Sequence, residues 1–138
     1  MAIRDEFRKL IVKEINYVIN KINKEGSIES KLYYFTGVHG IMQRLFNIDF
    51  DEELLIAHFV LNATYSTLNQ RLISIKNREA AVPLEEEQLR KLTIYLKQFA
   101  KKLEQKEDLN EVLHKFILLA YSTTGNGYYL LTKGLLKI

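Results

Sequence analysis

The chain has 138 residues, of which 47% are apolar and 27% charged, and its net charge at neutral pH is +3. The absence of cysteine excludes disulfides, thiol catalysis and thiolate metal sites. One proline and six glycines are too few for an all-β fold with many hairpins. We therefore expect an all-α protein, a bundle of five or six helices in a single domain over residues 1–138.

Other features of the sequence bear on where in the cell the protein is found. The first residues are charged and lack an apolar signal core, and no apolar run is long enough to cross a bilayer. These features predict a cytoplasmic protein with no membrane partner. The many Ile, Lys and Glu residues and the lack of Cys resemble the composition of thermophile proteins.

Two helices are predicted in the first 50 residues. The first spans about residues 3–24, because Phe7, Leu10, Ile11, Ile15, Val18 and Ile22 recur every three or four positions. The second begins near Ser27 or Ser30 and carries Gly37 and Gly40 on one face, where another helix can approach closely. His39 lies between these glycines. A general acid or base would need an orienting carboxylate, which the sequence does not supply, so a structural role is favoured.

The third helix is predicted to be the longest and to lie at the centre of the bundle. It follows a capping pattern at Asp49 and Glu52. Its apolar positions advance by alternate steps of four and three, which is a heptad repeat, through Leu54, His58, Leu61, Tyr65, Leu68, Leu72 and Ile75. The polar members of the stripe, His58 and Tyr65, either line a ligand pocket or, more simply, form hydrogen bonds that fix the register of an interface.

The fourth predicted helix follows Pro83 and carries the best nucleic-acid candidate. Lysines lie along it beside one tyrosine, an arrangement that can follow a phosphate backbone. However, acids early and bases late in a helix are also what the helix dipole favours, and Glu104 interrupts the set. The candidate nucleic-acid residues are Lys91, Tyr95, Lys97, Lys101 and Lys102.

A fifth helix is predicted to begin near Asp108 and Glu111. Glu111 and His114 are three residues apart and share a helix face, as in the metal sites of di-iron bundles. Those sites use the unit twice, and here the residue three before His58 is Leu55. We therefore interpret Glu111 as a helix cap and predict no metal and no cofactor.

The segment Gly125-Asn126-Gly127 resembles a phosphate-binding loop only superficially. It lacks the lysine of a Walker loop and follows a helix, whereas a dinucleotide fingerprint follows a strand. A hairpin turned by Asn126-Gly127 is one alternative. The simpler prediction places Gly125 or Gly127 in the left-handed conformation, so that a short C-terminal amphipathic helix folds back.

Two functions from different classes are compatible with these patterns. The first is a non-enzymatic interaction or assembly subunit, most simply a homodimer. Its candidate interface residues are His58, Leu61, Tyr65, Leu68, Leu72, Tyr128, Leu131 and Leu135. The alternative is a small basic helical subunit that binds RNA or DNA. An enzyme ranks third, because no catalytic constellation is visible.

Overall fold

The computed structural model describes residues 3–79 and 84–138, and the described residues form six helices and no strand. The all-α prediction is confirmed, and the third helix is the longest, with 25 residues. The first-turn position predicted for Pro83 lies outside the described residues. The helices are α1 (Asp5–Lys24), α2 (Ile28–Ile48), α3 (Glu52–Lys76), α4 (Glu86–Glu104), α5 (Asn110–Ser122) and α6 (Gly125–Thr132).

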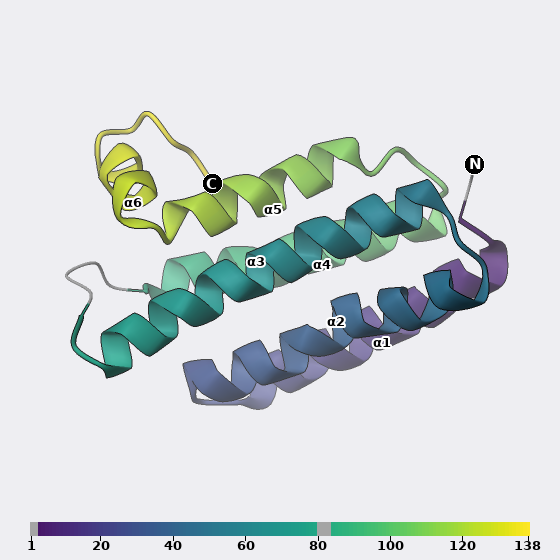
Figure 1. Ribbon diagram of the computed structural model, residues 1–138, viewed down its shortest axis with the longest axis horizontal. Coiled ribbons are helices and arrows are strands. Elements are labelled where there is room, and N and C mark those ends of the chain that lie inside the picture. Colours follow the sequence, from purple (N-terminus) through teal and green to yellow (C-terminus); the bar gives the residue numbers. More distant parts are fainter. Residues whose placement is uncertain (1–2, 80–83) are drawn as a thin grey trace.

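Five of these helices form a closed ring. Contacts run from α1 to α2, α2 to α3, α3 to α5, α5 to α4 and α4 back to α1, while α6 packs on α5. In Figure 1, α2, α3 and α5 form the near layer, and α1 and α4 lie behind them. The neighbours α3 and α5 run parallel, and the other neighbours in the ring run antiparallel (Figure 1).

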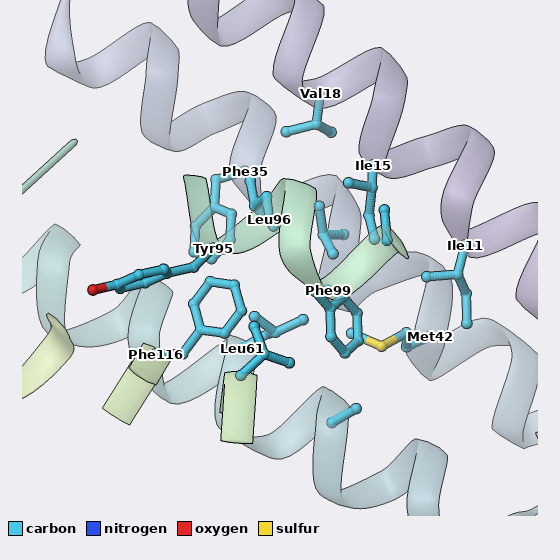
Figure 2. Close-up of a cluster of buried hydrophobic side chains, with 14 of the residues drawn as sticks. Ile11, Ile15, Val18, Phe35, Met42, Leu61, Tyr95, Leu96, Phe99 and Phe116 are labelled. Carbon is cyan, nitrogen blue, oxygen red and sulfur yellow. The ribbon is translucent and has the colours of Figure 1, made fainter. Parts of the chain in front are cut away.

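The core lies inside the ring and receives one apolar stripe from each of the five helices. Phe116 of α5 is fully buried, and its ring meets those of Tyr95 and Phe99 of α4 edge-on, at centroid distances of 6.0 and 6.3 Å. Figure 2 shows these rings with Ile15 and Met42 in one continuous cluster. The predicted stripes thus face the core, except that Leu10 on α1 is exposed.

Polar caps define where two helices begin. Helix α2 begins at Ile28, close to the predicted start, and the Ser27 side chain caps it by accepting a hydrogen bond from the Ser30 amide. The cap of α3 is Asp51, not Asp49, and its carboxylate accepts a hydrogen bond from the Leu54 amide at 3.0 Å. Asp49 instead follows the last residue of α2, where the backbone is extended, and its carboxylate pairs with Arg4 at 3.2 Å.

Candidate interaction surface

The heptad stripe of α3 lies inside the molecule. Leu61 and Leu68 are fully buried, and Tyr65 and Leu72 are half-buried against the same core. The stripe that was expected to face a second chain instead faces the rest of its own bundle, because α2 and α5 flank α3 on both sides. An interface on α3 must therefore use its outer side.

That outer side carries large apolar residues. Phe59 is 71% exposed and Ile56 is 54% exposed. At 100° per residue, both positions fall roughly opposite Leu61. No Asp, Glu, Lys or Arg occurs between Glu53 and Arg71, so the solvent side of α3 lacks the charges that a surface helix ordinarily presents.

Helix α5 continues this surface. Ile117 and Tyr121 are exposed, and no Asp, Glu, Lys or Arg occurs between Lys115 and Lys133. A shallow groove of about 220 Å³ separates the two helices and is lined by residues from both, among them Val60 and Ala63. We define the α3/α5 face by its six residues, Ile56, Phe59, Val60, Ala63, Ile117 and Tyr121.

The two ends of this face carry opposite charge. Because α3 and α5 run parallel, their N-terminal turns lie at the same end of the molecule (Figure 1). Glu52, Glu53 and Glu111 occupy those turns. At the other end lie Arg71, whose Nε donates to the Thr123 carbonyl, and Arg78 beyond the last turn of α3. The face is thus uncharged along its length. Glu52 and Glu53 lie at one end, where Glu111 pairs with Lys115, and Arg71 and Arg78 lie at the other end, where Glu79 lies near Arg71.

The C-terminal interface candidates do not form one stripe. Tyr128 is half-buried, and its hydroxyl donates to the Glu85 carboxylate at 2.7 Å, which raises the pKa of Tyr128. Leu131 is half-buried, whereas Leu135 is 75% exposed. They diverge because α6 ends at Thr132 and the chain then turns at Gly134, where φ is +74°.

The Gly125-Asn126-Gly127 segment starts a helix and does not end one. Neither glycine has positive φ, so the predicted left-handed position is wrong. Thr124 caps α6 by accepting a hydrogen bond from the Gly127 amide at 3.0 Å. A Cβ on Gly127 would lie 1.7 Å from the Tyr121 carbonyl oxygen, so this close approach requires glycine. We assign the segment an architectural role.

The structure brings together two histidines that sequence patterns had singled out separately. The rings of His39 on α2 and His58 on α3 lie 5.8 Å apart, and Tyr65 lies 5.7 Å from His39 on the other side. His58 Nδ1 lies 2.9 Å from the His39 carbonyl oxygen, and it must donate because a carbonyl only accepts. This bond ties α2 to α3, which agrees with a register-fixing role.

His39 itself has an unusual environment. Both of its ring nitrogens are buried, and neither has a hydrogen-bond partner in the described part of the chain. Burial, and then the neighbouring His58, lower the pKa of His39 below its ordinary value of 6.5. Without an orienting carboxylate or a nucleophile beside it, the neutral imidazole serves as an aromatic packing group.

The five nucleic-acid candidates on α4 do not share one surface. Tyr95 is buried against Phe116, so it offers no face for a base to stack on. Lys102 pairs with Glu107 at 3.3 Å, and Lys91 is half-buried. Lys97 and Lys101 are exposed.

Comparison with known families, curated proteins and solved structures finds no match to this chain. None of the six described helices is long and apolar enough to cross a membrane. Within residues 3–79 and 84–138, no three His, Cys, Asp or Glu side chains gather in a way that could hold a metal ion.

Proposed function

We propose that this protein is a helical assembly subunit that pairs with a second copy of itself through the α3/α5 face. The observation that carries the proposal is the exposure of Phe59, Ile56 and Ile117 on the uncharged outer side of two adjacent helices. Covering one such side chain is worth about 1.5–3 kcal/mol. Contiguous apolar surface of this kind is typical of contact regions between proteins.

The charges at the ends of the face favour a second copy over an unrelated partner. A two-fold axis through the middle of the face would place two copies antiparallel, with each face covering the other. Glu52 and Glu53 of one copy would then approach Arg71 and Arg78 of its partner. The central apolar residues, with Phe59 among them, would be buried against the same residues of the second copy.

A nucleic-acid function has weaker support. Stacking on an exposed aromatic side chain is a main source of affinity for single strands, and the one tyrosine of the candidate set is in the core. Two exposed lysines, Lys97 and Lys101, remain from that set.

The test is a charge placed at the centre of the face. The Phe59→Glu substitution should weaken dimerisation by at least about 30-fold, the loss expected from removing one hot-spot residue of 2 kcal/mol. Sedimentation equilibrium over a range of protein concentrations measures this constant. Because Phe59 is exposed, the helical circular dichroism spectrum should not change.

The matched control is Tyr33→Glu on α2. Tyr33 is 70% exposed, against 71% for Phe59, and it lies outside the α3/α5 face. We expect this variant to dimerise like the parent protein. A parent that stays monomeric, or equal weakening by both substitutions, would rule out the proposed interface.

A further inference from the structure

A second exposed patch lies over the seam between α1 and α2, at the edge of the bundle opposite α5 and α6 (Figure 1). It is aromatic: Tyr17 of α1 is 51% exposed and Tyr33 of α2 is 70% exposed. The half-buried ring of Tyr34 links them, at centroid distances of 6.3 Å from Tyr17 and 5.3 Å from Tyr33. Three tyrosine rings from two helices therefore form one connected cluster, and none of them belongs to the α3/α5 face.

Lysines accompany these rings. Steps of four, four and three residues along α1 connect Lys13, Tyr17, Lys21 and Lys24, so the four side chains share one side of the helix. The Lys21 Nζ lies over the rings of Tyr17 and Tyr34, 5.7 and 5.8 Å from their centroids. In the described part of the chain, none of the three lysines has a carboxylate within ion-pair distance. We define the α1/α2 tyrosine surface by its six residues, Lys13, Tyr17, Lys21, Lys24, Tyr33 and Tyr34.

Acidic residues are sparse around this surface. Helix α1 has no Asp or Glu between Glu14 and its end, and Glu25 follows the last turn. Glu29 is the one acid of α2, and it pairs with Lys76 at 3.0 Å. Glu14 is half-buried and turned toward Gly37, where its Oε1 would lie 2.6 Å from an added Cβ. The lysines therefore outnumber the acids beside the tyrosine rings.

This combination matches the chemistry of single-stranded nucleic acids, whose bases stack on exposed aromatic rings while cations hold the phosphates. The helix dipole favours lysines in the last turn of α1, but it does not explain Lys13 or the exposed tyrosines. Lysine is depleted in protein–protein interfaces, which argues against a protein partner. We infer that the α1/α2 tyrosine surface binds a single-stranded nucleic acid, whose bases stack on Tyr17 and Tyr33 while its phosphates contact the lysines.

The binding test uses fluorescence anisotropy of a labelled, mixed-sequence RNA of about 12 nucleotides that cannot pair with itself. The full-length protein should bind it saturably and about 5-fold or more tightly than it binds the duplex of that RNA with its complement, because paired bases cannot stack on the rings. The affinity should fall with salt at a log–log slope of about −2, the value for three phosphates of a single strand. A DNA strand of the same sequence should bind as well, since it offers the same stacking and phosphate contacts.

Substitutions at exposed rings locate the site. Tyr17→Ala should weaken RNA binding by about 5-fold or more, whereas Tyr17→Phe keeps the ring and should bind like the parent protein. The matched control is Tyr129→Ala on α6, because Tyr129 is 57% exposed and also has a lysine, Lys133, over its ring at 5.6 Å. This variant should bind RNA normally. Lys21→Gln should reduce the salt slope by about 0.7, and circular dichroism checks that each variant is folded.

Four outcomes would overturn the inference. These are the absence of saturable binding, equal affinity for the single strand and the duplex, and equal weakening by Tyr17→Ala and Tyr129→Ala. The fourth is loss of self-association in the Tyr33→Glu variant, which would assign the surface to a protein contact. Phe59→Glu should bind RNA normally, because Phe59 lies outside the surface. Failure of the dimer and failure of this site are therefore distinguishable.

Discussion

The two sides of the helical ring bury similar stripes but present opposite surfaces. On the α1/α4 side, lysines, arginines and glutamates occupy most of the outward positions, although Leu10 and Tyr17 of α1 are also exposed. On the α3/α5 side, the outward positions hold Ile56, Phe59 and Ile117, and charge is confined to the helix ends. The buried stripe of a helix thus shows where the helix packs in the fold, and its exposed side determines which other molecules it can contact.

The largest expected effect is a difference in stability between substitutions at two adjacent residues of α5. Phe116 points into the core and Ile117 points out. Phe116→Ala should reduce the free energy of unfolding by about 3–5 kcal/mol, because it leaves a cavity beside Tyr95 and Phe99. Ile117→Ala should change it by no more than about 0.5 kcal/mol while weakening self-association. Urea denaturation and sedimentation measure the two quantities, and a large loss of stability in both variants would refute the assignment of the outward side.

A smaller effect is expected at the start of α6, which packs on the same α5. Gly127→Ala should destabilise the protein by about 1–3 kcal/mol, since the added methyl would overlap the Tyr121 carbonyl. Gly125 is the control, because nothing lies within 4 Å of a Cβ placed there. Gly125→Ala should be neutral or slightly stabilising, as replacement of a helical glycine usually is. Thermal unfolding measures the melting temperatures of the two variants, and equal values would contradict this account.

The smallest of these effects is a pH dependence that originates between α2 and α3. Burial lowers the pKa of His39 in the folded chain, while the unfolded chain keeps the ordinary value of 6.5. Below pH 6.5 the unfolded state therefore binds more protons, and stability decreases as the pH falls toward the folded-state pKa. The contribution of His39 to the free energy of unfolding is fully present above pH 6.5. Urea denaturation between pH 5 and 8 should show this slope, and His39→Phe, which keeps a ring at the site, should reduce it. An unchanged slope in that variant would assign it to another group.

The helices themselves could be predicted from the sequence because periodicity is a local property. The stripe of α1, from Phe7 to Ile22, is buried as expected except at Leu10, and α2 begins beside Ser27. Which element packs against a stripe, in contrast, is not determined by the local sequence. A heptad repeat is equally suited to a partner chain and to the core of its own bundle, and only the positions of α2 and α5 decide that Leu61 and Leu68 are internal.

The same reason explains what was missed at the surface. His39 and His58 meet because α2 and α3 are antiparallel in one particular register, which no spacing in the sequence specifies. Gly127 is required by a carbonyl from the preceding helix. Phe59 did have a local signal, the absence of charge between Glu53 and Arg71, but that signal becomes informative only when Leu61 is known to face inward.

The closed ring also has a consequence for synthesis of the protein. Of the six described helices, α1 is synthesised before the other five, yet one of its two neighbours is α4, and the hydrogen bond from Arg8 to the Leu103 carbonyl joins residues 95 positions apart. At roughly 5–20 residues per second, translation leaves α1 without this neighbour for about 5–20 seconds. During that interval the apolar stripes of α1, α2 and α3 have only one another for cover. The nascent chain is thus most exposed to aggregation before its own second half arrives to complete the core.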